Sequence, residues 1–397
     1  MMTRTALLTL LLGSLLSACS APPRFLAVPE RQTYQAVLPG LSRMRYVVGN
    51  EQDMAQLNLD VADTWYRERL WLVSQGRPTH PLAPSNILAL SGGGDNGAFG
   101  AGLLTGWTAT GQRPEFLLVT GVSTGALIAP FAFLGPAYDP QLRTLYTQTG
   151  PEDIVSPRRW WAVLTDDAMA DTAPLRKQLR KYITRACLDA VAAEYTKGRE
   201  LWISTTNLDS RQRVIWNMTR LATNQDPRAV TLFQDVMLAS AAIPAAFPPV
   251  MIDVEVNGER HQEMHVDGGT TAQVFVYPTT VELGKLSKTG DGERERHLYL
   301  VMNSRLDPDW AQTERRVVSI AGRAISSLIH TQGVGDLYRI YLTTQRDGVD
   351  FNLSFIPSDF HPAHTQEFDT LYMQALFDRG YAMAKSGYTW QKVPPGF

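Results

Sequence analysis

After Pro84 the pattern of hydrophobic and polar positions alternates between short apolar runs and longer helical stretches. The run Ile87 to Leu90 leads through a glycine cluster into a helical stretch at Ala98 to Thr110, and the run Phe116 to Val119 leads into Gly121 to Leu134. Short apolar runs that alternate with helices are typical of a parallel sheet covered on both faces. We therefore expect a three-layer α/β/α fold with a mainly parallel central sheet.

The pattern continues to the C-terminus. The other predicted strands are Leu201 to Thr205, Val214 to Asn217, Met251 to Val256, Val274 to Tyr277, Leu298 to Met302 and Phe351 to Ile356. The other predicted helices are Pro174 to Glu194, Pro227 to Ala241, Arg315 to Tyr341 and Thr365 to Lys385. In the third of these helices one apolar face is marked by Val317, Ile320, Ala321, Ala324, Leu328 and Ile329.

Three stretches with different patterns divide the chain. Residues 1–18 have the pattern of a cleaved leader, and residues 19–84 that of a proline-punctuated tether followed by a helical segment. Residues 85–397 form the predicted α/β domain. The helical segment before it has one apolar face, at Met54, Leu57, Val61, Trp65 and Leu72.

The leader carries the features of a secretory signal. Arg4 supplies a positive charge, and Ala6 to Leu16 is an apolar stretch shorter than the ~20 residues that span a bilayer. Leu16-Ser17-Ala18-Cys19 resembles a bacterial lipobox, in which the cysteine becomes acylated and holds the mature chain on a membrane surface. Ser20, where an aspartate would favour the inner membrane, implies the outer membrane. An ordinary signal peptide with a chance cysteine is the alternative.

Composition excludes some classes of protein. Hydrophobic residues make up 44% of the chain, and 37 Lys+Arg against 39 Asp+Glu give a net charge of -2. A near-neutral chain without a basic run lacks the electrostatic footprint of a nucleic-acid binder. With Cys19 acylated, Cys187 is the only thiol left, which rules out an internal disulfide; we expect it to be a small buried residue rather than a nucleophile.

A G-x-S-x-G element, Gly121-Val122-Ser123-Thr124-Gly125, lies between an apolar strand and a helix. Such a turn is sharp, so glycines on either side of the serine remove clashes, and the hydroxyl projects next to a helix N-terminus. The motif predicts Ser123 as a nucleophile on an elbow made by Gly121 and Gly125. A serine at an ordinary strand-to-helix turn is the alternative.

A glycine cluster, Ser91 to Gly97, follows the preceding strand. Gly92, Gly94 and Gly97 fit the G-x-G-x-x-G fingerprint of a dinucleotide-binding oxidoreductase, but the acidic residue expected ~20 positions later, at the end of the next strand, is missing. Unhindered amides at a helix N-terminus also stabilise a developing oxyanion. We therefore predict an oxyanion hole in the loop of Gly92, Gly93, Gly94 and Gly97.

A third motif, Asp267-Gly268-Gly269, places a carboxylate at the end of a predicted strand on a permissive turn. Taken alone it is typical of an Asp-Gly hairpin turn. In order and spacing, however, the three motifs resemble the patatin-like phospholipase family. The stretches Ala239 to Pro244 and Phe247 to Pro249 add to the resemblance, which covers residues 86–269 well.

The resemblance implies an activity and roles for residues. It implies a serine hydrolase that cleaves the carboxyl esters of lipids without a cofactor or a metal. Ser123 is then the nucleophile, Asp267 its partner, and the amides of Gly93 and Gly94 the oxyanion donors. One departure matters: the family usually has Arg or Lys where this chain has Asn96, so any contribution of that cation is missing.

Two alternatives to the dyad stay open at this stage. An α/β-hydrolase would use a Ser-Asp-His triad, for which His297, His330, His361 and His364 lie downstream, although none is in a recognisable motif. A catalytically idle lipoprotein could keep the fold to bind a lipid or a protein partner. Intact Ser123 and Asp267 argue against the idle protein, and Asn96 argues mildly for it.

Two further patterns are weaker. His261-Gln262-Glu263-Met264-His265 resembles a zinc motif but misses both H-E-x-x-H and H-x-x-E-H, so we predict no metal there. Trp160 and Trp161 follow two arginines, a combination that suits a lipid interface. Core packing is the commoner fate of adjacent tryptophans.

Overall fold

The computed structural model describes residues 24–158, 166–285, 294–308 and 310–397. Its centre is a mainly parallel sheet in the order β1-β7-β6-β3-β2-β10-β11, with β8 and β9 attached through β6. The five strands from β6 to β11 run parallel, whereas β1, β7, β8 and β9 pair antiparallel. The strands of this sheet are β1 (Arg45–Val47), β2 (Ser85–Leu90), β3 (Leu118–Gly121), β6 (Glu200–Asn207), β7 (Gln212–Asn217), β8 (Val250–Val256), β9 (Glu259–Asp267), β10 (Arg296–Met302) and β11 (Asp350–Phe355).

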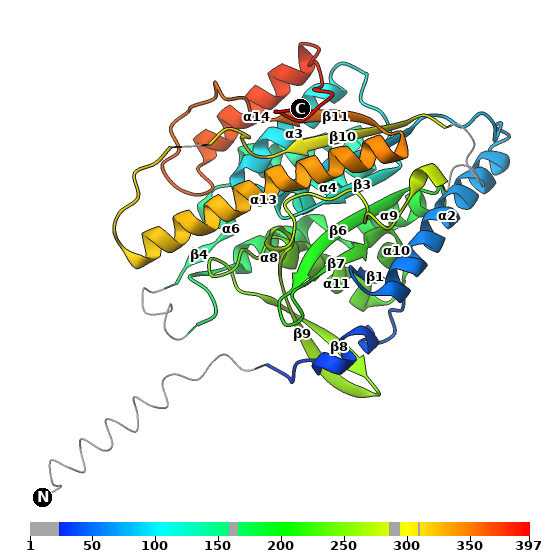
Figure 1. Ribbon diagram of the computed structural model, residues 1–397, viewed down its shortest axis with the longest axis horizontal. Coiled ribbons are helices and arrows are strands. Elements are labelled where there is room, and N and C mark those ends of the chain that lie inside the picture. Colours follow the sequence, from blue (N-terminus) through cyan, green and yellow to red (C-terminus); the bar gives the residue numbers. More distant parts are fainter. Residues whose placement is uncertain (1–23, 159–165, 286–293, 309) are drawn as a thin grey trace, which may run out of the picture.

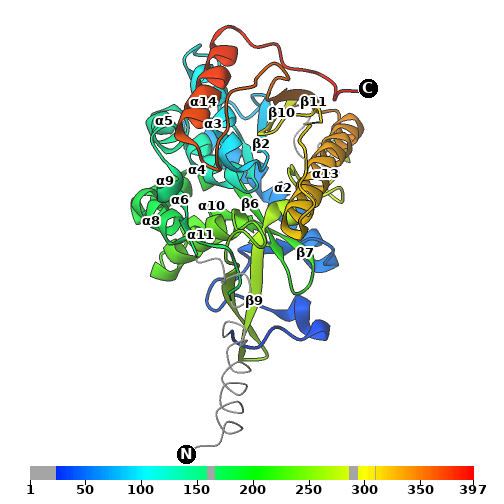
Figure 2. The same ribbon diagram turned by 90° about the vertical axis from the view of Figure 1, so that its left-hand side faces the viewer.

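Helices cover both faces of the sheet, which makes the predicted three layers (Figures 1 and 2). One face packs against α3 (Gly97–Thr108), α4 (Thr124–Leu134), α5 (Asp139–Thr147), α8 (Ala173–Tyr182), α9 (Arg185–Tyr195), α10 (Met218–Thr223), α11 (Pro227–Ser240) and α14 (Thr370–Lys385). The other face packs against α2 (Glu51–Ser74) and α13 (Val317–Asp347). The short helix α6 (Pro151–Ile154) and the pair of β4 (Ser156–Pro157) and β5 (Ala170–Asp171) lie outside the layers.

The central strands consist of residues that are buried between the two helical layers. Every residue of β6 is buried, and so are all but one in β2, because helices cover these strands on both sides. On one face α3 and α14 approach very closely: a Cβ on Gly102 would lie 2.0 Å from the carbonyl oxygen of Phe377, and one on Gly380 would lie 2.4 Å from that of Phe99. Glycines on both helices thus permit contact between their backbones.

The segment before the α/β domain packs onto it. Strand β1 pairs with β7 at the edge of the sheet, and α2 buries its predicted apolar residues Met54, Leu57, Val61 and Trp65. Arg294 forms an ion pair of 2.6 Å with Glu68 on α2. These contacts fix the helix of the N-terminal segment against the sheet.

Two predicted elements are wrong. Residues Val274 to Val276 are buried but form no strand, because the run crosses the end of the sheet, where the Thr120 hydroxyl donates to the Phe275 carbonyl at 2.5 Å. The predicted helix Pro174 to Glu194 is two helices, α8 and α9. Thr184 caps the second of them by accepting a hydrogen bond from the Cys187 amide, which favours a new start at that point.

Helix α13 is present as predicted but is not buried along its whole length. Its predicted apolar face is exposed near the N-terminus, where Val317 is 85% exposed and Leu328 is 70% exposed. In the described part of the chain, no helix is long and apolar enough to cross a membrane.

Candidate active site

Ser123 lies at the sharp turn between β3 and α4. Its backbone has φ 54° and ψ −125°, a conformation that a non-glycine residue rarely adopts. The flanking glycines allow it, since a Cβ on Gly121 would lie 2.8 Å from the Cα of Ala126 and one on Gly125 only 2.4 Å from the carbonyl oxygen of Leu90. The predicted elbow is therefore formed by the predicted residues.

A second serine holds this turn in place. The amide of Ser123 donates to the hydroxyl of Ser240 at 3.0 Å, and that hydroxyl donates to the carbonyl of Ser204 at 2.7 Å. Ser240 ends α11 and Ser204 lies in β6, so both layers brace the elbow. The sequence analysis gave Ser240 no role, although it lies inside the Ala239 to Pro244 stretch that carried the resemblance.

Asp267 meets Ser123 because β3 and β9 occupy successive parts of the same edge of β6. Strand β3 ends where Gly121 pairs with Ile203, and β9 approaches from the opposite direction and ends where Asp267 pairs with Thr205. Strand β7 fills the other edge of β6. The two strand ends therefore meet, which places the Ser123 hydroxyl near enough to the Asp267 carboxyl to favour its ionised form.

The Asp267 carboxyl is buried, with few polar groups around it. It accepts a hydrogen bond of 2.7 Å from the amide of Gly269. Burial raises the pKa of Asp267 to about 7, and the nearby Ser123 hydroxyl and the Gly269 amide only partly oppose the rise. The exposed fractions of Ser123 and Asp267 are 6% and 5%. The pair is thus a serine hydroxyl beside a carboxyl that changes charge near neutral pH.

The glycine loop lies against the serine but does not offer all four amides. A Cβ on Gly92 would lie 3.2 Å from the Cβ of Ser123. The amide of Gly92 donates to the Gln273 carbonyl at 2.9 Å, and that of Gly97 donates within its own turn to Gly94 and Asp95. In the described part of the chain, the amides of Gly93 and Gly94 donate to no acceptor. The oxyanion-hole prediction therefore narrows to these two residues.

Two polar side chains that the sequence analysis missed hold the loops of the site. Gln273 accepts from Gly92 with its carbonyl and donates from its side chain to the Gly269 carbonyl at 3.0 Å, so it joins the glycine loop to the Asp267 turn. Asn303 donates its side-chain amide to the Ser91 carbonyl at 2.9 Å. In the sequence, only their positions could have pointed to these two residues: Gln273 follows the Asp-Gly-Gly turn, and Asn303 follows β10.

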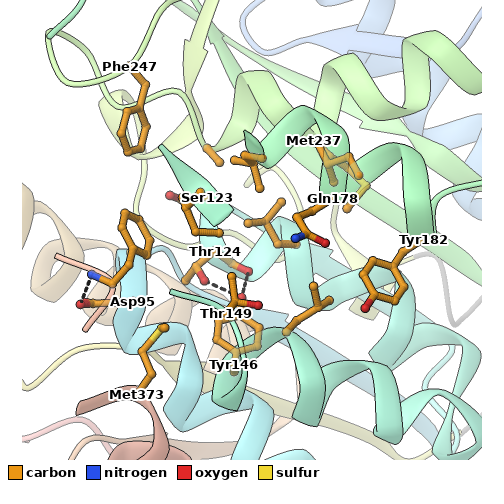
Figure 3. A pocket seen from close by; sticks show the side chains of 18 of the residues that line it. Asp95, Ser123, Thr124, Tyr146, Thr149, Gln178, Tyr182, Met237, Phe247 and Met373 are labelled. Carbon is orange, nitrogen blue, oxygen red and sulfur yellow. Dashed lines mark hydrogen bonds between the residues drawn. The ribbon is translucent and has the colours of Figure 1, made fainter. Parts of the chain in front are cut away.

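Ser123 opens into an apolar pocket (Figure 3). Phe247 lies on one side of the serine and Tyr182 on the other, and Thr124 shares a hydrogen bond of 2.6 Å with the Tyr146 hydroxyl. Thr149 and Gln178 add polar side chains to the lining. The apolar lining comes from α4, α5, α6, α8, α11 and the C-terminal region, with Leu127, Phe131, Leu145, Ile154, Leu175, Leu179, Ile183, Met237, Phe368 and Met373. Such a lining suits a hydrocarbon chain.

The four histidines of the triad alternative have other surroundings. His297 is 3.1 Å from Asp350, His361 is 2.9 Å from the guanidinium of Arg305, and His330 lies on α13. Asp95 beside the glycine loop accepts hydrogen bonds from His364 at 2.8 Å and from the Phe368 amide at 3.0 Å. Within the described ranges, none of the four histidines hydrogen-bonds to Ser123 or Asp267.

The weaker candidate residues lie in structural networks. His265 is fully buried between Thr205 at 2.8 Å and Glu263 at 3.0 Å, and Glu263 is also paired with Arg45. Burial opposes ionisation of Glu263, but Arg45 and His265 outweigh it and lower its pKa to about 2. Cys187 is buried, as expected, and burial raises the pKa of its thiol to about 11. A protonated thiol of this kind is not an activated nucleophile.

Other predicted features lie outside the described residues. They are the signal at residues 1–18, the lipidation residue Cys19, and the adjacent Trp160 and Trp161. Asn96, where the chain departs from the family, is among the described residues. The Tyr372 hydroxyl donates to the Asn96 side-chain oxygen at 2.5 Å, at the start of α3. A tyrosine from α14 thus contacts the position where the family usually has a cation.

Fold and site together define an α/β protein with a serine on a strand-to-helix elbow and a carboxyl as its direct partner. Residues 88–279 match the family model described as patatin-like phospholipase, so the chain contains a domain of the patatin-like phospholipase family. This family indicates lipid acyl hydrolase activity.

Known proteins other than the family model add no information about the activity of this chain. No curated protein sequence matches the chain. The crystal structure of VipD from Legionella pneumophila is similar at a TM-score of 0.34 and 11% sequence identity, over 77% of this chain and 66% of that one. The chain therefore spans less than two thirds of VipD as that structure has it, and a likeness at this level carries no inference about activity.

Proposed function

We propose that the chain is a serine acyl hydrolase that cleaves the carboxyl esters of lipids, in the manner of a phospholipase A or a lysophospholipase. The observation that carries the proposal is the position of the Ser123 hydroxyl beside the buried Asp267 carboxyl, with Ser123 opening into an apolar pocket. A hydroxyl with a base within reach is the arrangement that nucleophilic catalysis uses. The family assignment supports the same reaction class.

In the proposed mechanism Asp267 takes the proton of Ser123 while the serine oxygen attacks the ester carbonyl. The amides of Gly93 and Gly94 hold the oxyanion of the tetrahedral intermediate, and the alcohol leaves with the proton from Asp267. The acyl group then remains on Ser123. Asp267 next takes a proton from water, which attacks the acyl-enzyme and releases the fatty acid and the free serine hydroxyl.

The buried position of Asp267 makes this assignment chemically reasonable. An aspartate in water has a pKa near ~3.9 and is a poor base for a hydroxyl. Burial raises the pKa of Asp267 to about 7, so the carboxylate is a stronger base while still available at neutral pH. Each oxyanion donor adds roughly 2.7 to 4 kcal/mol of transition-state stabilisation.

The pocket supports a long-chain acyl group as the part of the substrate next to the reacting carbonyl. Its lining is mostly apolar, with Thr149, Gln178 and the hydroxyls of Tyr146 and Tyr182 as polar groups. Burial of a methylene contributes about 0.8 kcal/mol, so a long chain binds far better than a short one. The head group meets no such constraint from these residues.

We further propose that acylated Cys19 anchors the mature chain in the bacterial outer membrane. The lipobox-like sequence before Cys19 supports this proposal, and Ser20 supports the outer rather than the inner membrane. Several acyl chains on one cysteine give stable attachment, whereas a single chain is marginal. The enzyme would then remain beside lipid substrates.

The test is serine-directed labelling with a fluorophosphonate probe, together with hydrolysis of a long-chain lipid ester. We expect the native chain to be labelled and active, and Ser123→Ala to lose both properties while unfolding at the same temperature. A native chain that takes up no label and hydrolyses no lipid ester would favour the idle binding protein instead. Labelling that persists in Ser123→Ala would remove the serine from the mechanism.

A further inference from the structure

The N-terminal half of α13 leaves much of its apolar side-chain surface exposed. Apolar side chains on it are exposed, with Val317 at 85%, Ile320 at 53%, Ile325 at 47% and Leu328 at 70%. Trp310, in the segment leading to the helix, is 88% exposed. We call Trp310, Val317, Ile320, Ile325, Leu328 and Ile329 the α13 face. An exposed apolar face of this extent on a helix marks an interaction site.

The helix joins the body of the domain only in its second half. A Cβ on Gly333 would lie 3.5 Å from side-chain atoms of Gln273 and of Met302, and Leu337 is 1% exposed. Figure 1 shows the part before this point projecting beyond the sheet. The helix therefore carries its apolar face away from the core on a rigid support.

The projecting half lies at the edge of the sheet where the active site is located. Helix α13 follows β10, and the end of β10 meets the glycine loop, where the Asn303 amide donates to the Ser91 hydroxyl at 2.7 Å. In Figure 1 its N-terminal half projects at the end of the molecule where α6 and the strand β4 also lie, and Figure 2 shows α13 and α6 on opposite faces of the sheet. A flat surface that meets the projecting half would thus lie along the edge of the sheet at which Ser123 is located.

The charge of the neighbouring residues favours one of the possible binding partners of the α13 face. Residues 310–316 contain Arg315 and Arg316 against a single acid, Glu314, although the whole chain has a net charge of -2. Glu314 is already 3.3 Å from Arg316. In a symmetric contact with a second copy, this basic stretch would meet itself. Anionic lipid head groups attract such a stretch.

We propose that the α13 face docks onto the surface of an anionic lipid bilayer, with its apolar side chains in the interface and Arg315 and Arg316 among the head groups. A wide apolar face, a tryptophan and arginines are the features of a helix that lies in a membrane interface. The inference rests on the proposed lipid hydrolase function and deepens it, because it names a bilayer as the physical form of the substrate.

The binding test uses the full chain and vesicles of phosphatidylglycerol and phosphatidylcholine. A spin label is placed by Leu328→Cys on the α13 face, or by Leu59→Cys on α2, where Leu59 is 65% exposed; in Figure 1 α2 lies at the opposite end of the view from the N-terminal half of α13. With vesicles, we expect the label at 328 to become shielded from a water-soluble relaxation agent and the label at 59 to stay accessible. Replacing phosphatidylglycerol by phosphatidylcholine should weaken the shielding.

Two results would overturn the docking proposal. One is a label at 328 that stays as accessible with vesicles as without them. The other is shielding that appears without vesicles and rises with protein concentration, since a second copy would then cover the face. Because this test involves no turnover, it also reads out if the chain has no hydrolase activity.

The functional test compares two substrates. The double variant Ile320→Glu with Leu328→Glu should lose about tenfold or more of the hydrolysis of vesicle lipid, because each change removes a leucine-sized apolar contact with the bilayer. Hydrolysis of a soluble short-chain ester should not change. The matched control Leu59→Glu should alter neither reaction. An equal loss on both substrates, or an unchanged rate on vesicles, would contradict docking through this face.

Discussion

Ser123 and Asp267 lie beside each other because the strands that carry them end at the same edge of β6. Gly121 pairs with Ile203 and Asp267 pairs with Thr205, so the register of β6 sets how far apart the two ends lie. A shift of two residues in either pairing would separate hydroxyl and carboxyl by more than a hydrogen bond. The dyad is therefore a property of the sheet as much as of the two turns.

Asp267→Asn should lower kcat by orders of magnitude, close to the loss in Ser123→Ala, because residues that act as one unit fail together. The substitution keeps the shape and an acceptor for the Gly269 amide. The controls are His297, His330, His361 and His364, each changed to Ala, and each should keep substantial activity in folded protein. A near-native Asp267→Asn enzyme together with one inactive histidine variant would favour the α/β-hydrolase triad.

The pH dependence of kcat/KM should report the Asp267 carboxyl. Its pKa is raised to about 7 by burial, and only the ionised form accepts the serine proton. Activity on a soluble ester should therefore rise through pH 7 and level off above it, with a slope of one proton. A profile already flat from pH 5 upward would mean that the carboxyl is ionised at its ordinary pKa.

The same carboxyl should make the free energy of unfolding depend on pH. Between its ordinary pKa of 3.8 and the raised pKa of about 7, the folded chain keeps a proton that the unfolded chain has released. Stability from this site is thus present at low pH and is lost as the pH rises, by up to about 1.4 kcal/mol per pH unit.

Asp267→Asn should remove that contribution. Urea unfolding of the native chain and the variant at several pH values gives the difference between them, in which other titrating groups cancel. We expect the variant to gain on the native protein from pH 4 to pH 7 and to be the more stable one at pH 8. A difference that is constant with pH would show that Asp267 titrates alike in both states.

Gly93→Ala and Gly94→Ala should differ sharply although the residues are neighbours. A Cβ on Gly93 would lie 2.0 Å from the backbone oxygen of Asn303, so the oxyanion loop must move and activity should be lost. A Cβ on Gly94 meets nothing within 4 Å, and its φ of +59° costs a side chain only about 1 to 2 kcal/mol. Rates and melting temperatures of both variants check this. Equal losses would show that the loop is not held by Asn303.

Cys19→Ala should release the chain from membranes or leave it unprocessed, because the proposed acyl anchor can no longer form. Fractionation of cell envelopes measures the partition, and Cys187→Ala is the matched control, since that thiol is buried and should not contribute to attachment. A Cys19→Ala chain of native size that remains fully in the outer membrane would show that another feature holds it there.

Elements whose signals lie within a few residues of one another could be predicted from the amino-acid pattern alone. Short buried runs predicted β2, β6, β10 and β11 within about two residues, because an apolar run bounded by turn residues has few other uses. The sequence also predicted the elbow at Ser123, whose glycines are required by backbone clashes within a few residues. The strand predicted from Val274 to Tyr277 was wrong because an apolar run shows only that residues are buried. It does not show whether they pair with a neighbouring strand.

Features that depend on distant parts of the chain could not be predicted and became visible in the folded domain. The meeting of β3 and β9 on one edge of β6 brings Asp267 to Ser123, and the carbonyl of Gln273 occupies the amide of Gly92 while those of Gly93 and Gly94 stay open. Burial of Asp267, which raises its pKa, depends on the same packing. The exposure of α13 is a similar case, because an amphipathic pattern defines a face but does not specify what covers it.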